Sequence, residues 1–408
     1  MDEINFFPDD LEIKDQKIIL RLDLNVPIKD KVIKDDTRIT LCLPFINRLI
    51  EKKAKIIIIS HLGRPKGINV PDLSLIPIYK YLKDALKTNV YFFRGTFDGE
   101  TKKKFSHLKG GEVILIENIR FFKEETEDGQ DFSKKLGELG DIYINDAFSC
   151  SHRKQASVHG ITRFVKKSYA GPLLKKEITA INLVIKNKKE PVTCIIGGSK
   201  ISTKINVITN LLKKVNNIVI VGAMANNFFV HKNLKVGKSL IEKNTKEIIT
   251  NIYKKAEEHN CEILIPEDCM VGTDFEGTGK NKNLNEIQEN EIILDIGFNT
   301  IKKIQKKINE SNTVLWNGPA GYFENKNFLK GTLSIAENIS KNTIEKSLIS
   351  IIGGGDTLAA INKSDDKLTF SHLSTAGGAF LEYLEGKDLP GISAVSYTHL
   401  TLPTILLV

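Results

Sequence analysis

The sequence predicts an α/β protein with two Rossmann-like three-layer domains, each built on a parallel sheet. Short continuous runs of Ile and Val alternate with segments of helical periodicity almost throughout the chain. Such runs are typical of parallel strands that helices cover on both faces. The chain has 408 residues, which suits two domains of ordinary size better than one. Polar or glycine-rich strings follow the apolar runs, at the sheet edge where parallel sheets bind ligands.

In the first half, four apolar runs are predicted strands and one amphipathic segment is a predicted helix. The segment from Thr37 to Lys53 places Ile39, Leu43, Ile46 and Ile50 at helical spacing. The strands are expected at residues 18–20, 56–59, 113–116 and 142–144.

The second half repeats the alternation. Its strands are expected in a parallel sheet at residues 193–196, 218–221, 263–265, 292–294, 314–316 and 349–352. Residues 173–186 read as one helix, which predicts a connector. We therefore expect an N-terminal domain at 1–170, a connecting helix at 171–190, a C-terminal domain at 191–375, and a segment at 376–395 that returns toward the first domain.

Composition excludes several classes of protein. The five cysteines are scattered without a Cys-x-x-Cys pair, so buried thiols are expected rather than disulfides or a zinc site. The net charge of +9 fits either nucleic acid or a phosphorylated small substrate. No basic tract interleaved with aromatic residues occurs, which argues against nucleic acid. The acidic N-terminus and the lack of a long apolar run indicate a cytoplasmic protein without a membrane span.

Cationic and polar side chains recur where the first-half strands end. Arginine offers a planar fork that matches phosphate and carboxylate. A small polyanion that also bears hydroxyls would suit the cluster, although any single arginine could form a surface ion pair instead. The members of the cluster are Asp23, Asn25, Arg38, His61, Arg64, Arg120 and Arg153.

Glycine turns follow two strands of the second half. Gly197-Gly198-Ser199-Lys200 leads into a predicted helix that would place Lys200 and Lys204 on one face. The string is not a Walker A motif, because that spacing is absent. Gly353-Gly354-Gly355-Asp356-Thr357 repeats the device, and free N–H groups at a helix start favour anions.

Two acidic residues near these turns are candidates for ligand binding. Asp356 could bind magnesium, a cation that prefers oxygen ligands, or it could simply cap a helix. Glu324 follows the strand-end string WNGPAGYF and could bind ribose hydroxyls.

At this point the chain resembles the phosphoglycerate kinase family, from about Lys17 to Gly391. Any one of the matching strings is weak, but nine in the family's order are highly specific. They are RLDLNVP, DDTR, SHLGRP, ENIRF, INDAF with SHR, GGSKIST with the next lysine, WNGPAGYFE, GGGDT, and ST followed by GG.

The resemblance implies two domains that face each other across a cleft and exchange a phosphoryl group between 1,3-bisphosphoglycerate and Mg-ADP, in glycolysis. It implies that the seven residues of the first-half cluster bind 3-phosphoglycerate, and that Arg38, Lys200, Gly354 and Gly355 act in catalysis. The family is expected to be monomeric, with small molecules as its only partners. The implied nucleotide-binding residues are Gly197, Gly198, Lys200, Lys204, Gly222, Asn317, Pro319, Glu324, Gly353, Gly354, Gly355, Asp356 and Thr357, with Asp356 also the magnesium ligand.

Some positions depart from the family's pattern. Val221, Phe298 and Ala376 do so around the predicted adenine pocket and closing loop, which leaves the nucleotide preference open. Residues 396–408 match nothing in the family and look like a translated sequencing adaptor, so we predict a non-native tail, with a genuine terminal strand as the alternative.

Two other classes compete with a kinase. A Rossmann-type dehydrogenase would need Gly-x-Gly-x-x-Gly after the first strand, which is absent. A non-catalytic nucleotide- or RNA-binding protein on the same fold is the second alternative.

Overall fold

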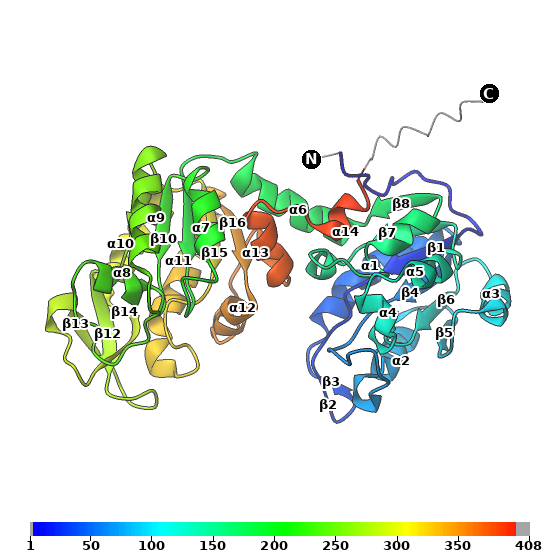
Figure 1. The fold of residues 1–408 in the computed structure, drawn as a ribbon, viewed down its shortest axis with the longest axis horizontal. Coiled ribbons are helices and arrows are strands. Elements are labelled where there is room, and N and C mark those ends of the chain that lie inside the picture. The colour runs from blue at the N-terminus through cyan, green and yellow to red at the C-terminus, as the bar shows by residue number, and fades with distance from the viewer. Residues whose placement is uncertain (1–2, 397–408) are drawn as a thin grey trace. The chain divides into compact units, whose positions relative to one another are not determined.

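The computed structural model describes residues 3–396, so all but the first residue of the predicted tail lies outside the described residues. The chain forms two compact units, each with its own parallel sheet (Figure 1). Unit 1 comprises residues 3–177 and 388–396, and unit 2 comprises Ile178–Lys387. The chain passes from one to the other within helix α6 (Pro172–Ile185), close to the predicted connector.

All neighbouring strands of the unit 1 sheet pair in parallel. Their spatial order is β5 (Val90–Phe93), β6 (Val113–Ile116), β4 (Lys55–Ile59), β1 (Lys17–Arg21), β7 (Ile142–Asn145) and β8 (Lys167–Ala170). The unit also holds a hairpin of β2 (Ile28–Lys29) and β3 (Val32–Ile33), 3₁₀ turns η1 (Pro71–Leu73), η2 (Ile119–Phe121), η3 (Phe148–Cys150) and η4 (Gly160–Phe164), and helices α1 (Thr37–Glu51), α2 (Ile76–Ala85), α3 (Gly99–Ser106), α4 (Lys123–Thr126), α5 (Gln130–Gly137) and α14 (Pro390–Ser393).

The parallel sheet of unit 2 runs in the order β11 (Glu262–Leu264), β10 (Asn217–Ile220), β9 (Val192–Ile196), β15 (Thr313–Asn317), β16 (Ile349–Gly353) and β17 (His372–Ser374). Its helices are α7 (Ile205–Leu212), α8 (Ala225–His231), α9 (Lys246–Glu258), α10 (Phe298–Glu310), α11 (Lys330–Lys346), α12 (Gly355–Ile361) and α13 (Gly378–Leu384), with 3₁₀ turns η5 (Leu284–Glu286) and η6 (Lys326–Phe328).

The predicted α/β fold with parallel sheets is confirmed, but one predicted strand was assigned to the wrong sheet. The run at 292–294 lies in β14 (Ile292–Ile296), which pairs antiparallel with β12 (Asp268–Gly272). With β13 (Lys280–Asn283), these strands form a separate small sheet. An apolar run indicates that a strand is buried, but it does not indicate which strand it pairs with. The sequence therefore could not separate the two sheets.

Packing of the Ile-rich strands against the helices makes the cores. In unit 1, Ile18, Ile56 and Ile58 are fully buried together with Ile39 and Ile46 of α1. Burying a side chain of this size contributes about 1.5–3 kcal/mol, so this packing stabilises each sheet against its helices. All five cysteines are buried thiols.

The strand register aligns the C-terminal ends of neighbouring strands at the sheet edges that carry the candidate sites. Arg21 at the end of β1 lies opposite Ile59 of β4 and Asn145 of β7. In unit 2, Asn317 at the end of β15 lies opposite Ile196 and Gly353. Loops that follow these strands therefore start side by side, which brings residues far apart in sequence to one edge.

Candidate functional site

Arg38, Asp23 and Asn25 form the centre of a polar cluster at the edge of the unit 1 sheet. An Arg38 Nη1 group lies 2.5 Å from Asp23 Oδ2 and donates to the Asn25 carbonyl at 3.2 Å. The Asn25 side-chain oxygen accepts from the Gly63 N–H at 2.9 Å, which ties the loop after β1 to the loop after β4. Three of the predicted residues are thus held together by direct contacts.

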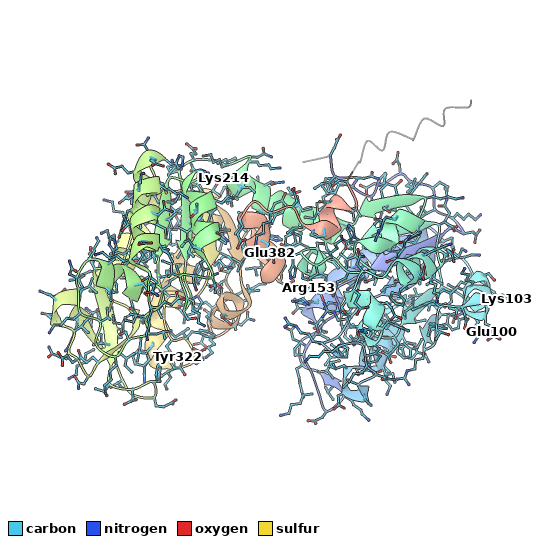
Figure 2. All side chains as sticks on the ribbon, viewed as in Figure 1. Glu100, Lys103, Arg153, Lys214, Tyr322 and Glu382 are labelled. Carbon is cyan, nitrogen blue, oxygen red and sulfur yellow. The ribbon has the colours of Figure 1, made fainter. Side chains whose placement is uncertain are left out.

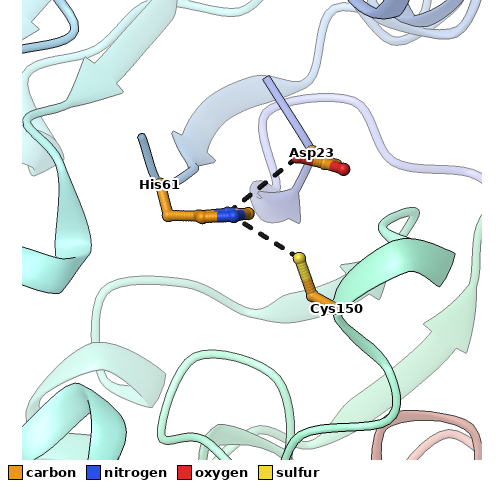
Figure 3. A group of neighbouring side chains, drawn as sticks. All are labelled: Asp23, His61 and Cys150. Carbon is orange, nitrogen blue, oxygen red and sulfur yellow. Dashed lines mark hydrogen bonds and ion pairs between the residues drawn. The ribbon is translucent and has the colours of Figure 1, made fainter. Parts of the chain in front are cut away.

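His61 lies beside Asp23 and Cys150 (Figure 3). Its Nδ1 is 3.3 Å from Arg21 Nη2, 3.7 Å from the Cys150 sulfur and 4.0 Å from Asp23 Oδ1. Burial lowers the pKa of His61 well below its usual range, and the surrounding arginines, Arg21 foremost, lower it further. The imidazole is therefore neutral at physiological pH.

The Asp23, His61 and Cys150 ligand atoms lie within 4.8 Å of one another, close enough to suggest a metal site. The chemistry of the neighbours favours an anion instead. Arg21 already donates to His61 Nδ1, and Arg38 already pairs with Asp23. Burial raises the pKa of the Cys150 thiol, so it stays protonated, whereas a metal needs the thiolate.

The other predicted arginines differ in how firmly they are held. Arg120 is buried in η2 and donates to the Gly63 carbonyl at 2.8 Å. Its Nε is buried and has no hydrogen-bond partner among the described residues. Burial lowers its pKa to about 10, with repulsion from Arg21 and Arg153 adding to the effect. Arg120 remains a cation at neutral pH with one donor to spare.

Arg153 follows η3, is half-buried, and donates from Nε to His152 at 3.2 Å (Figure 2). Arg64 is exposed in the loop after β4, and within residues 3–396 it makes no hydrogen bond or ion pair with the cluster. The structure therefore brings together Asp23, Asn25, Arg38, His61 and, through Gly63, Arg120, while Arg64 stands apart from their hydrogen bonds.

In unit 2, the predicted glycines let three loops approach backbone to backbone. A Cβ added at Gly197 would meet the Pro319 carbonyl oxygen at 2.3 Å, and one at Gly222 would meet the Gly198 nitrogen at 2.8 Å. Gly318 has a φ of 102°, a conformation that other residues rarely adopt. The loops after β9, β10 and β15 thus form one layer of close-packed backbone that only glycine permits.

Lys204 and Asn317 meet beneath this layer. The Lys204 ammonium donates to the Asn317 side-chain oxygen, and burial lowers the pKa of Lys204 to about 8. The Asn317 Nδ2 is buried and has no partner within the described part of the chain. Thr357 is buried and accepts from the Gly318 N–H at 2.7 Å, so it supports the loop rather than facing solvent.

A cavity of about 500 Å³ opens beside these loops, a size typical of small-molecule sites. Five predicted nucleotide residues line it: Gly198, Gly222, Pro319, Glu324 and Asp356. Sequence reasoning missed its apolar wall, which includes Phe229, Leu240, Phe275, Leu294 and Tyr322. Tyr322, labelled in Figure 2, contacts Phe275 edge to face, with the two ring centroids 5.1 Å apart. Phe298, which departs from the family's pattern, does not line this cavity. It is the first residue of α10, where the Lys330 ammonium lies over its ring.

The predicted helical pairing of Lys200 with Lys204 is wrong. Helix α7 begins only at Ile205, so Lys204 is its N-cap residue and Lys200 lies in the preceding loop. Glu242 holds this loop away from helical geometry, because it accepts from the Ser202 N–H at 3.1 Å and from the Ser202 hydroxyl at 2.5 Å. Glu242 is 40 residues away from Ser202 in the sequence, so no local pattern signalled it.

The reading of Asp356 as a helix cap is also wrong. The N-cap of α12 is Gly354, whose φ of 102° requires glycine, and Asp356 lies in the first turn of the helix. Gly353 is the last residue of β16, and Gly355 and Asp356 are both exposed. The Asp356 carboxylate therefore lines the cavity without a capping role.

The chain is therefore an α/β protein of two units. Unit 1 carries an arginine cluster at the edge of its sheet, and unit 2 has a cavity beside the glycine loops at the edge of its own sheet. The phosphoglycerate kinase family model matches residues 8–387, so the chain belongs to that family. It is therefore a phosphotransferase with a carboxyl group as acceptor, and its place is in glycolysis.

Named relatives agree with this membership. A phosphoglycerate kinase of Chelativorans sp. (strain BNC1) is 41% identical over 390 residues, which cover 95% of this chain and 98% of the relative. One from Wolbachia pipientis wMel is 43% identical over 387 residues, covering 94% and 96%. The solved structure of phosphoglycerate kinase from Coxiella burnetii has a TM-score of 0.85 at 38% identity and covers 95% of this chain and 97% of its own. Within residues 3–396 we find no helix with the length and apolar character of a membrane span.

Proposed function

We propose that unit 1 binds 3-phosphoglycerate and unit 2 binds the adenine nucleotide. The arginine cluster carries the first half of the proposal, since Arg38 contacts Asp23 and Asn25 directly and Arg120 is joined to Asn25 through Gly63. The cations would bind phosphate and carboxylate, and the acidic and amide groups would bind hydroxyls. The cavity carries the second half, because its apolar wall suits a purine and its glycine loops suit phosphates.

The chemistry requires no general base. In the direction of ATP use, the nucleophile is the carboxylate of 3-phosphoglycerate, whose pKa lies far below 7, so it is already deprotonated. Catalysis then depends on positioning and on neutralising charge on the transferring phosphoryl group. Arg38 and Lys200 would supply cations, and the N–H groups of Gly354 and Gly355 at the start of α12 would add donors.

Asp356 fits the magnesium ion that nucleotide-dependent kinases require. Its carboxylate is exposed, borders the cavity beside Gly198 and Glu324, and offers the oxygen ligands that Mg²⁺ prefers. When bound there, the ion would neutralise nucleotide phosphate charge. Glu324 is proposed to bind the ribose hydroxyls from the same rim of the cavity.

Because the two ligands are assigned to different units, transfer requires the units to bring the carboxylate and the terminal phosphate together. Exclusion of water at that moment would protect the acyl phosphate from hydrolysis. A monomeric state and a cytoplasmic location are proposals of the same kind, supported by the family alone.

A coupled assay of ADP formation tests the reaction. We expect ADP to form only when ATP, Mg²⁺ and 3-phosphoglycerate are all present. A protein that binds ATP tightly but forms no ADP with 3-phosphoglycerate would instead be a non-catalytic nucleotide-binding protein on this fold.

A further inference from the structure

A buried line of polar groups stands behind His61. Glu125, Ser157 and Arg21 are fully buried, and His61 is 4% exposed. They come from separate parts of unit 1: Glu125 from α4, Ser157 from the segment after η3, Arg21 from the end of β1, and His61 from the loop after β4. Four buried groups that can carry charge or a proton in one line need a physical reason, because burying them is costly.

Arg21 donates hydrogen bonds toward both ends of this line, to Ser157 and to His61. Ser157 donates its N–H to Glu125 Oε2 at 2.8 Å and its hydroxyl to Glu125 Oε1 at 2.7 Å. The Ser157 oxygen in turn accepts from Arg21 Nε at 2.9 Å. Arg21 Nη2 then lies 3.3 Å from His61 Nδ1. Each contact fixes the orientation of the next group.

The donation from Arg21 decides which ring nitrogen of His61 carries the proton. A guanidinium can only donate, so Nδ1 must offer its lone pair to Arg21 and the proton must lie on Nε2. Asp23 favours the opposite tautomer, since a carboxylate would accept from an Nδ1–H. However, Asp23 Oδ1 is 4.0 Å from Nδ1, beyond hydrogen-bond distance, whereas Arg21 is at 3.3 Å.

We propose that Glu125, Ser157 and Arg21 are positioning residues that hold His61 as the neutral tautomer with its proton on Nε2. The proposal rests on the proposed function, in which His61 binds 3-phosphoglycerate. An Nε2–H is then a donor with a fixed direction for an oxygen of the substrate. The carboxylate of Glu125 offsets the charge of Arg21, which would otherwise be buried alone.

The variant Ser157→Ala tests the relay, because the loss of one oxygen atom removes the hydroxyl's hydrogen bonds to Arg21 and to Glu125 and leaves only the backbone N–H of residue 157 on Glu125. Ser133→Ala is the matched control: Ser133 is a fully buried serine of the same unit whose hydroxyl has no partner among the described residues. Two-bond ¹H–¹⁵N spectra of the histidine rings distinguish the two tautomers, and His61→Gln assigns the His61 signals. Steady-state kinetics with 3-phosphoglycerate and melting temperatures accompany each spectrum.

We expect His61 in the wild type and in Ser133→Ala to carry its proton on Nε2. In Ser157→Ala, the Nδ1–H form should appear, and KM for 3-phosphoglycerate should rise by about tenfold, the scale of one lost hydrogen bond, while kcat changes less. An Nδ1–H in the wild type overturns the proposal. So does a raised KM in Ser157→Ala with an unchanged tautomer, because Ser157 would then be purely structural.

Glu125→Gln is the second variant if Ser157→Ala does not fold. Its amide keeps an oxygen for the Ser157 N–H but presents an NH2 donor to the Ser157 hydroxyl, and it removes the charge that offsets Arg21, so the same tautomer change is expected. Retention of the pure Nε2–H form in a folded Glu125→Gln protein contradicts the relay. The proposed function fails separately, if the wild type forms no ADP with 3-phosphoglycerate; the tautomer spectra would still report on the relay.

Discussion

Lys204 should make nucleotide binding depend on pH in a range where the phosphates of ADP keep their charge. Burial lowers the pKa of this lysine to about 8, and its ammonium group donates to Asn317 under the glycine loops. If only the ammonium form attracts phosphate, the apparent Kd scales with one plus the ratio of neutral to charged lysine. Between about pH 7 and about pH 9, that factor grows by about tenfold.

Isothermal titration of ADP with excess Mg²⁺ at several pH values measures this slope. Lys204→Arg is the control, because a guanidinium does not deprotonate in this range, so its Kd should change little with pH. The sign for stability follows from the same pKa. Folding lowers it from 10.5, so the lysine opposes folding below about pH 8, and that cost fades as pH rises toward 10.5. A wild-type Kd that stays flat over these two pH units, or an equal slope in Lys204→Arg, would show that the Lys204 ammonium does not bind the nucleotide phosphates.

Substitutions at three further positions separate binding from catalysis. Lys200→Ala should lower kcat by about 10²-fold or more, the scale of one lost donor to the transition state, with little change in KM; a kcat within about threefold of wild type would remove Lys200 from catalysis. Asp356→Asn should weaken Mg-ADP binding in calorimetry and leave 3-phosphoglycerate binding intact, whereas normal Mg-ADP affinity would remove Asp356 as the metal ligand. Arg38→Ala should lower kcat more than it raises KM, and Arg38→Lys should rescue poorly, because lysine lacks the planar fork; full rescue in steady-state kinetics would show that charge alone suffices.

Most of the fold could be predicted from the sequence because parallel strands leave a strong local signal. The runs around Ile56 and Val314 lie on the sheets as expected, and α1 and α6 lie close to their predicted bounds. The antiparallel sheet was missed because β14 carries the same apolar signal as a parallel strand, and only its pairing with β12 distinguishes it. Pairing is a long-range property that no window of sequence contains.

The residues of the candidate site also include some that the sequence could predict and some that it could not. Arg38 and Gly197 could be predicted because they stand directly beside recognisable strings at predicted strand ends. Ser157 and Glu242 could not, since their partners lie 136 and 40 residues away and a serine or glutamate alone carries no signal. Arg21 was within reach, because it ends β1 and opens the string RLDLNVP, but a buried arginine at the end of a strand reads like a surface one.

Titration with one ligand at a time measures whether each unit binds its own ligand. Arg64→Ala removes an exposed cation of unit 1, and Lys204→Gln removes a partly buried cation of unit 2. Titrating each variant with 3-phosphoglycerate alone and with ADP alone gives four affinities to compare with wild type. We expect Arg64→Ala to lose affinity only for 3-phosphoglycerate and Lys204→Gln to lose affinity only for ADP. If Arg64→Ala instead weakens ADP and spares 3-phosphoglycerate, with Lys204→Gln doing the reverse, the two ligands have been assigned to the wrong units.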